Sequence, residues 1–182
     1  PGIIAFANAF WMHGPGLGGG DRRAIEILRR LKAKGIGIRI VASRMAYQNY
    51  SPYIAAEYVI VPLSEIDSLG LVIGYLLRTI SALLLRVRWS NSCILYSTSD
   101  FLPDVFPAVF MKSRNKRAKW IQVVHHLIPS PRSRPGSLHM NLLSYYAQKV
   151  SLVLVGRFAD LVITVSPPLK RDLIARGFDP TR

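Results

Sequence analysis

Short runs of apolar residues recur along this chain, and longer segments that mix apolar and polar residues at helical spacing separate them. Short, fully apolar runs are typical of strands buried on both sides, as in a parallel sheet. The alternation therefore predicts a doubly wound, Rossmann-like α/β sheet with right-handed crossovers. The expected strands cover residues 3–7, 36–42, 58–62, 93–96, 120–124 and 161–165.

The segments between these runs have helical patterns. In the clearest one, Asp21 is suited to cap the start, Gly35 to follow the end, and Ala24, Ile25 and Leu28 to form a buried stripe. The pattern predicts further helices at about 65–89, 103–112, 138–157 and 166–176. Residues 43–57 are polar and aromatic without such a pattern, so we expect a loop there.

The helix expected over residues 65–89 is strongly apolar. Arg78 interrupts its apolar run before the run reaches the roughly 18 to 20 residues that a membrane span requires. We therefore expect a buried helix, with a membrane span as the alternative.

Composition limits the architecture and the partners. At 182 residues, half of them hydrophobic, the chain can bury one core, so we expect a single domain. The 24 Lys and Arg against 10 Asp and Glu give a formal net charge of +14, which attracts nucleic acid, anionic lipid or phosphorylated substrates. The single cysteine, Cys93, excludes an internal disulfide and fits a reducing, cytoplasmic location. The chain starts at Pro1, and we expect its natural N-terminus to lie upstream.

A glycine-rich segment from Gly14 to Gly20 leads directly into the helix that begins near Asp21. The first amides of a helix are unpaired and carry the positive end of its dipole, and glycines let an anion approach the backbone closely. The segment is therefore a candidate phosphate site. The alternative is a flexible connection between strand and helix.

Other candidate residues follow the expected strands, because ligands of open parallel sheets bind beyond the carboxyl ends of the strands. Ser166 is equally suited to cap the last helix, and Asp100 to stabilise a turn. Neighbouring strand residues point in opposite directions, so only one of His125 and His126 is expected to face the site. No Cys, His, Asp or Glu group has metal-ligand spacing. The candidate positions are Gly16–Gly20, Ser97–Asp100, His125, His126 and Ser166.

The glycines also match G-x-G-x-x-G at Gly14, Gly16 and Gly19, which raises the alternative of an NAD(P)-binding oxidoreductase domain. Five residues separate the first strand from Gly14, where that fingerprint needs an immediate turn, and Arg44 follows the second strand instead of a carboxylate. A 2′-phosphate could still pair with Arg44.

Three segments resemble those of family 4 glycosyltransferases. Residues 18–22, GGGDR, resemble its G-G-x-E, with Asp21 in place of glutamate. Residues 123–127, VVHHL, resemble its V-x-H-D-L, with His126 where aspartate is common. Residues 159–173 resemble the A-D-x-V-I-x-V-S…L-K-x-D-L segment that closes its N-terminal domain. The three occur in the family's order over essentially the whole chain.

The resemblance implies the GT-B architecture, in which two Rossmann-like domains face a cleft. Residues 1–182 would be the N-terminal, acceptor-side domain of an incomplete chain, and the C-terminal donor-binding domain with its E-x7-E would be absent. By implication, the protein transfers a sugar from a nucleotide sugar to a lipid-linked or other glycan acceptor with retention of configuration, and it needs no metal or bound cofactor. We expect this chain alone to be inactive.

The resemblance also implies roles for individual residues. Gly18 and Gly19 would offer backbone amides to the donor diphosphate, and His125 would be the catalytic residue in contact with the transferred sugar. We expect Asp100, His126 and Ser166 to be further substrate-binding positions.

The remaining expectation concerns membranes. Arg132 and Arg134 lie in a proline-rich loop before the apolar segment 138–157, a combination that favours peripheral attachment to an anionic membrane at the cytoplasmic face. The alternative is that this helix is buried core. A non-enzymatic basic module that binds anionic membrane or nucleic acid is a further alternative. The aromatic residues lie mostly inside expected strands and helices, so we expect no nucleic acid partner.

Overall fold

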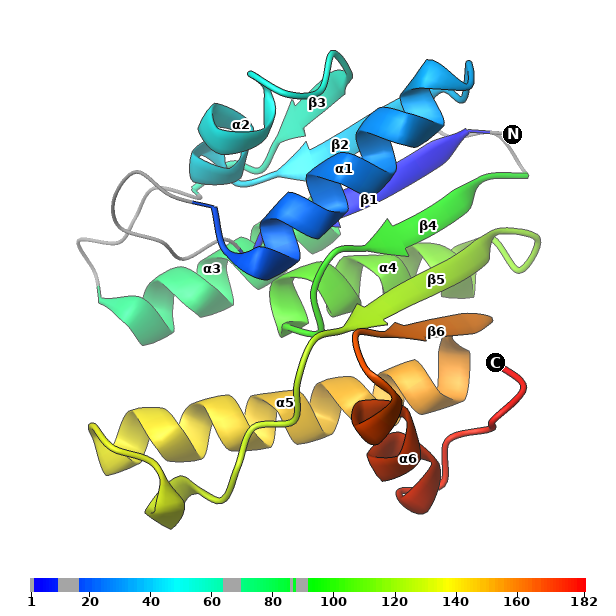
Figure 1. Ribbon diagram of the computed structural model, residues 1–182. Coiled ribbons are helices and arrows are strands. Elements are labelled where there is room, and N and C mark those ends of the chain that lie inside the picture. Colours follow the sequence, from blue (N-terminus) through cyan, green and yellow to red (C-terminus); the bar gives the residue numbers. More distant parts are fainter. Residues whose placement is uncertain (1, 10–16, 64–69, 86, 88–91) are drawn as a thin grey trace.

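The fold is a six-stranded, all-parallel sheet with strand order β3-β2-β1-β4-β5-β6 (Figure 1). The computed structural model describes residues 2–9, 17–63, 70–85, 87 and 92–182. The order reverses at β1, so crossovers run to both edges of the sheet, as in doubly wound folds. The strands are β1 Ile3–Ala7, β2 Ile38–Ala42, β3 Glu57–Ile60, β4 Ile94–Ser97, β5 Lys119–Val124 and β6 Leu161–Thr164.

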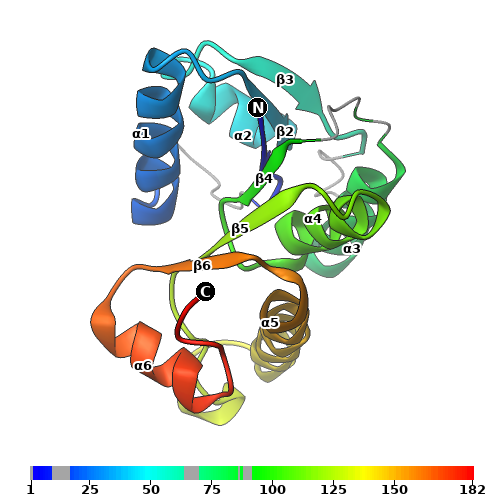
Figure 2. The same ribbon diagram turned by 90° about the vertical axis from the view of Figure 1, so that its right-hand side faces the viewer.

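Helices cover both sides of the sheet, with α1, α2 and α6 on one side and α3, α4 and α5 on the other (Figure 2). A short 3₁₀ turn, η2 Pro131–Ser133, precedes α5. The helices are α1 Gly19–Ala33, α2 Arg44–Tyr50, α3 Leu71–Leu84, α4 Leu102–Arg114, α5 Leu138–Phe158 and α6 Pro167–Ala175.

Each side of the sheet has its own apolar core, because side chains of a strand alternate between the two sides. Ala5 and Ile40 pack under α1 and α2, whereas Phe6, Leu95 and Trp120 pack under α3 and α4. All five are buried. The apolar runs in the sequence are therefore strands covered on both faces, and the predicted Rossmann-like fold is confirmed.

The prediction was wrong about the loop over residues 43–57, which contains helix α2. The Ser43 hydroxyl accepts a hydrogen bond from the Ala46 amide and caps this helix, and Tyr50 is buried at its end. Such a helix is too short to show a convincing apolar period, so the sequence reads as a loop.

The start of α1 also differs from the prediction. Gly18, in an extended conformation, precedes the first helical residue, Gly19, and Asp21 lies inside the first turn. Its carboxylate accepts a hydrogen bond from the Tyr50 hydroxyl (2.9 Å) instead of capping the helix. The end agrees with the prediction, because Gly35 has a φ of +79°, a conformation that favours glycine.

The described part of the segment predicted as one helix over residues 65–89 is α3, Leu71–Leu84. Arg78, which interrupts the apolar run in the sequence, is 1% exposed and points into the protein. The outer side of α3 is therefore free of this charge.

Candidate functional site

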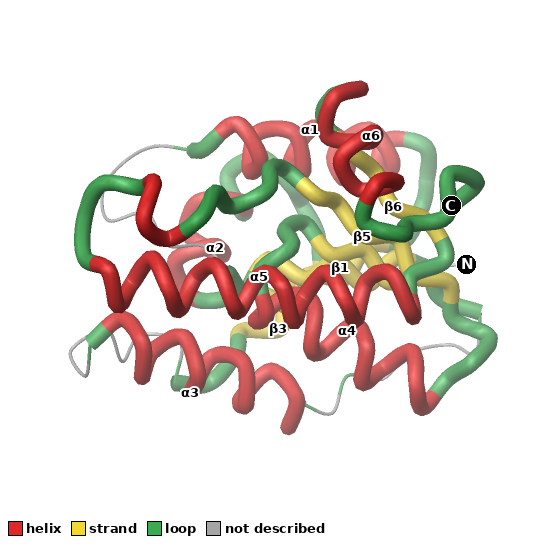
Figure 3. The backbone as a smooth tube through the Cα atoms, turned by 90° about the horizontal axis from the view of Figure 1, so that it is seen from below, coloured by secondary structure: helices red, strands yellow, loops and turns green. Residues whose placement is uncertain are grey.

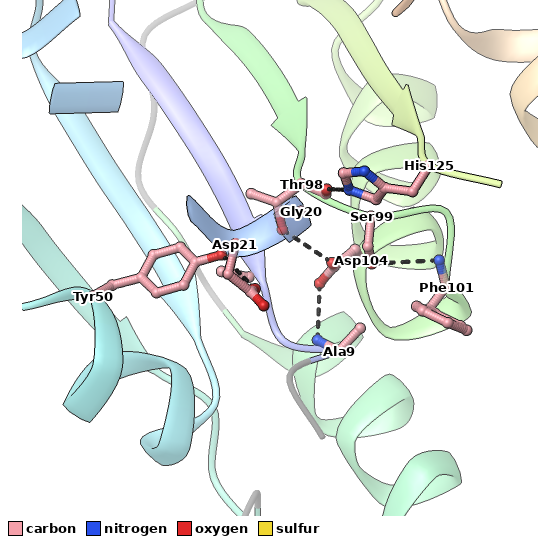
Figure 4. A pocket seen from close by; sticks show the side chains of 10 residues that line it. Ala9, Gly20, Asp21, Tyr50, Thr98, Ser99, Phe101, Asp104 and His125 are labelled. Carbon is pink, nitrogen blue, oxygen red and sulfur yellow. Dashed lines mark hydrogen bonds between the residues drawn. The ribbon is translucent and has the colours of Figure 1, made fainter. Parts of the chain in front are cut away.

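A cavity of about 260 Å³ lies where β1, β4 and β5 end and α1 begins (Figure 4). This is the edge at which parallel α/β sheets bind ligands. The cavity brings together segments that are far apart in the sequence, and its lining has polar side chains beside small apolar ones. Residues lining it are Ala7, Ala9, Gly20, Asp21, Tyr50, Thr98, Ser99, Phe101, Asp104 and His125.

His125 follows β5 directly, and its imidazole extends toward the start of α1 (Figure 4). Its Nε2 lies 2.7 Å from the carbonyl oxygen of Thr98. A carbonyl can only accept a hydrogen bond, so Nε2 carries the proton, and the Nδ1 of the neutral ring remains an acceptor. The ring is thus held in one tautomer at the edge of the cavity.

The imidazole packs closely on Gly20. A Cβ at position 20 would lie 2.9 Å from Cε1 of His125 and 3.0 Å from its Nε2, so only glycine leaves room for the ring in this position. At Gly19 a Cβ would meet nothing within 4 Å. Gly20 therefore has a steric role that the adjacent Gly19 does not share.

The N-terminus of α1 borders the same cavity. Gly18 makes no side-chain cap, and the first amides of the helix follow it at Gly19 and Gly20. Unpaired amides at the positive end of a helix dipole favour an anion. The Asp21 carboxyl is oriented to Tyr50, and burial raises the pKa of Asp21 above its ordinary value despite that hydrogen bond.

Asp104, near the start of α4, is a buried carboxyl group of the cavity. Its Oδ1 accepts hydrogen bonds from the amides of Asn8 (2.6 Å) and Ala9 (3.2 Å), and its Oδ2 accepts one from the Ser99 hydroxyl (2.6 Å). Burial raises the pKa of Asp104 to about 7, although these hydrogen bonds and a weaker one from Thr98 lower it. Asp104 fixes the segment after β1 against the loop after β4.

Asp100 was predicted as a substrate-binding residue or a turn residue, and the structure places it as a buried acceptor. Its Oδ2 accepts a hydrogen bond from Nε2 of Gln148 on α5 (2.6 Å), and its carbonyl accepts one from the Ser151 hydroxyl (2.7 Å). The His125 amide donates a long bond to Oδ1 (3.4 Å). Asp100 does not line the cavity around His125. Its contacts join α5 to the loops that carry the site.

The other predicted residues lie apart from that cavity. His126 is exposed, next in the chain to His125, and its carbonyl accepts a hydrogen bond from Gln148 (2.7 Å). The Ser166 hydroxyl accepts the Leu169 amide (3.4 Å) as the N-cap of α6. Gly18 and Gly19 are placed at the start of α1, whereas Gly14 and Gly16 lie outside the described residues.

Sequence reasoning missed two residues of this site, Tyr50 and Asp104. It included Gly20 and Ser99 in candidate segments, without the packing of Gly20 on His125 or the hydrogen bond from Ser99 to Asp104. An aspartate after Pro103 at a helix start reads as an ordinary first-turn residue. The sequence feature that could have pointed to Asp104 is the serine- and threonine-rich segment 97–99 just upstream, whose hydroxyl groups can donate hydrogen bonds to a carboxylate. Within the described residues, no group of three or more His, Cys, Asp and Glu could hold a metal ion.

A second cavity has a volume of about 570 Å³. It lies between the first turns of α1 and the end of α2. Its lining combines a cation, two carboxamides and an aromatic ring: Leu17, Arg22, Ile25, Gln48, Asn49, Pro52 and Tyr53.

The sheet order defines a Rossmann-like domain, and the cavity lies at the carboxyl ends of its strands. Residues 17–182 match the family model of Glycosyltransferase Family 4, so the chain belongs to that family. A search among curated proteins gave no match.

Among solved structures, the chain is similar to UDP-N-acetylglucosamine 2-epimerase from Rickettsia bellii, with a TM-score of 0.56 and 13% identity. The likeness covers 98% of this chain and 42% of that one, so the chain spans less than half the length of its structural neighbour. At this identity the likeness shows the fold, which is of the GT-B type.

Proposed function

We propose that this domain is the acceptor-side half of a retaining glycosyltransferase, which moves a sugar from a nucleotide sugar to a lipid-linked or other glycan acceptor. Family membership supports transfer of a sugar. The observation that carries the rest is the close packing of His125 on Gly20, which puts an imidazole beside the anion-binding end of α1.

The donor diphosphate binds at the start of α1. Negative charge grows on the leaving diphosphate as the glycosidic bond breaks, and the amides of Gly18 and Gly19 with the helix dipole stabilise that charge. These groups are fixed before the reaction, so they need no reorganisation during it. No metal is needed to balance the charge in this scheme.

His125 positions the transferred sugar. The bond from Nε2 to Thr98 leaves Nδ1 able to accept a hydrogen bond from a sugar hydroxyl. The acceptor glycan occupies the second cavity, where Tyr53 offers a ring face and Gln48 and Asn49 offer amide groups. His126 and Ser166 contact substrate only from outside the cavity at His125.

The other half of the site comes from a second domain. The chain spans 42% of a GT-B neighbour, and one Rossmann-like domain supplies only one wall of a two-domain cleft. We place the reaction at the cytoplasmic face of a membrane, with the cationic loop of Arg132 and Arg134 near the lipid, because both side chains precede the apolar helix α5.

The test is a transfer assay on the full-length protein that contains this chain. A panel of nucleotide sugars is incubated with lipid-linked and free glycan acceptors, with and without a metal chelator, and NMR identifies the anomer formed. We expect transfer with retention that the chelator does not change, and no transfer by the 182-residue chain alone.

Four outcomes would overturn parts of this proposal. Inversion, or loss of activity with the chelator, would contradict the mechanism. Measurable transfer by the isolated chain would contradict the need for a second domain. Binding of NAD(P) without any sugar transfer would favour an oxidoreductase domain instead.

A further inference from the structure

Helix α5 buries polar residues beside apolar ones and exposes a row of large apolar residues. Asn141, Gln148 and Ser151 are buried and hydrogen-bonded. The opposite side exposes large apolar residues at spacings of three and four, which places them in one stripe. The stripe comprises Leu138, Leu142, Tyr146, Val150 and Val153. A helix that faces water exposes polar residues instead.

Helix α3 also buries polar side chains. Its inner side contains Arg78, Thr79 and Ser81, all buried, beside the buried Tyr75 and Ala82. Its outer side exposes a second apolar stripe, with Leu84 76% exposed. That stripe comprises Val72, Ile73, Leu76, Ile80 and Leu84.

The two stripes belong to one helical layer. Figure 3 shows α3, α4 and α5 together along one side of the molecule, and α4 packs against both of the others. Phe110 of α4 is also exposed, with the Arg114 guanidinium 4.6 Å from the centre of its ring. Large apolar side chains exposed on neighbouring helices of one layer favour an interaction site.

This side of the molecule has cations and almost no carboxylates. In the sequence, Asp100 and Asp104 are the only acidic residues between positions 68 and 159, and both are buried. Lys149 and Arg157 are exposed on α5, and the Lys149 ammonium lies 4.6 Å from the centre of the Tyr145 ring. Arg132 precedes the same helix and is exposed.

None of the helices in the described residues is long and apolar enough to cross a bilayer. An apolar helix side flanked by Lys and Arg is instead the pattern of a segment that lies in the membrane interface. A second copy of this chain would bring like charges against these cations, which opposes self-association through this face.

We infer that the outer sides of α3 and α5 are a docking surface for an anionic lipid bilayer. The apolar stripes enter the acyl boundary, while Lys149, Arg157 and Arg132 contact lipid phosphates. This inference rests on the proposed function in one respect: a lipid-linked acceptor would explain why the domain docks on a membrane. The buried side of α5 holds Asp100 and the backbone after His125, so docking would fix the site at a set position over the membrane.

Vesicle flotation of the 182-residue chain tests the surface without any transfer assay. Vesicles of phosphatidylcholine alone are compared with vesicles that also contain phosphatidylglycerol. We expect binding to the anionic vesicles only, decreasing as salt is added. The pair Val150→Ser and Val153→Ser on α5, and the pair Leu76→Ser and Leu84→Ser on α3, should each reduce binding by about tenfold or more.

Matched controls distinguish binding through this surface from non-specific hydrophobic binding and from the effect of net charge. Tyr47→Ser with Ile174→Ser removes exposed apolar side chains from α2 and α6, on the opposite side of the sheet, and should leave binding unchanged. Lys149→Ser with Arg157→Ser should weaken binding by about fivefold per cation. Lys32→Ser with Lys34→Ser on α1 removes the same charge and should have a clearly smaller effect. Circular dichroism verifies that each variant is folded.

Equal binding by the α3 and α5 variants and by the wild type would overturn the inference, as would binding to neutral vesicles that salt does not change. Sedimentation velocity provides the remaining outcome. A dimer that the α5 variant abolishes would show that a second copy covers this face and would refute the bilayer assignment. A transferase that is active but fails to bind vesicles would refute the surface and leave the proposed function intact.

Discussion

Helices α1 and α5 lie on opposite sides of the sheet, and their outer sides differ completely. The outer side of α1 is charged, with Glu26 paired to Arg29 (2.9 Å) and Arg30 (2.6 Å), while Ala24 and Leu28 face the core. The outer side of α5 exposes an apolar stripe beside Lys149 and Arg157, and its inner side buries polar residues together with Leu152 and Val155. A helix with the first pattern is built to face water, and one with the second pattern needs another partner.

Both helices nevertheless support the same histidine. Gly20 of α1 packs against the imidazole of His125, and Gln148 of α5 bonds the carbonyl of His126 and the amide of Ile128. Both helices therefore support the segment around His125. They differ in the surroundings that their outer sides suit, which are water for α1 and an apolar partner for α5. Substitutions in and around these two helices test whether both support His125, and their expected effects range from large to small.

Asp104 of α4 joins the segment after β1 to the loop after β4, beside His125, and its titration should have the largest effect. The pKa of about 7 lies above the ordinary value of 3.8, so between these pH values the folded state binds more protons than the unfolded state. Stability should therefore fall as the pH rises from about 4 to about 7 and then level off, by an amount on the order of 4 kcal/mol.

Asp104→Asn keeps an acceptor for the amides of Asn8 and Ala9 and removes the titration. Urea unfolding at about pH 5 and about pH 8 measures the difference. The wild type should lose stability relative to the variant at the higher pH, and a difference that does not change with pH would contradict the raised pKa of Asp104.

His125 is the point at which the two helices converge. In the full-length enzyme, His125→Ala should lower kcat more than it raises KM, by about 10 to 1000-fold, if its contact strengthens in the transition state. His126→Ala, next to it but exposed, should have a milder effect. Steady-state kinetics and melting temperatures are measured for both. Normal turnover with a depressed melting temperature in His125→Ala would remove His125 from the site.

The two sides of α5 should respond differently to substitution. Gln148→Leu strips partners from the Ile128 amide and from the Asp100 carboxylate, so unfolding free energy should fall by about 2 to 3 kcal/mol. Val153→Ser, on the exposed side, should change it by less than about 0.5 kcal/mol. Denaturant titrations compare the two. Similar losses would show that the apolar side of α5 is packed in solution.

Adjacent glycines of α1 provide the finest comparison. Gly20→Ala forces the His125 ring to move, so kcat should fall by about tenfold, whereas Gly19→Ala meets open space and keeps its backbone amide. Gly19→Ala should instead raise the melting temperature slightly, because alanine favours a helix over glycine. If Gly20→Ala had no more effect on kcat than Gly19→Ala, the packing would not position His125.

Much of the fold could be predicted because its signals are local. The apolar strands, the positive-φ glycine after α1 and the Ser166 cap of α6 all depend on neighbouring residues. The short helix α2 escaped prediction because seven residues show no clear period. For the site, sequence reasoning gave the right edge of the sheet and His125 as a candidate, since strand order alone places that residue at a carboxyl end.

By itself, the sequence determined the alternation of strands and helices, the cationic character of residues 105–159 and the family segments. Tertiary structure alone decided that Gly20 packs against His125, that the Tyr50 hydroxyl donates a hydrogen bond to the Asp21 carboxylate, and that Arg78 points inward. Apolar period and charge are properties of the chain read residue by residue. Which side of an apolar helix is buried depends on contacts with residues far along the chain, and these exist only once the sheet has formed.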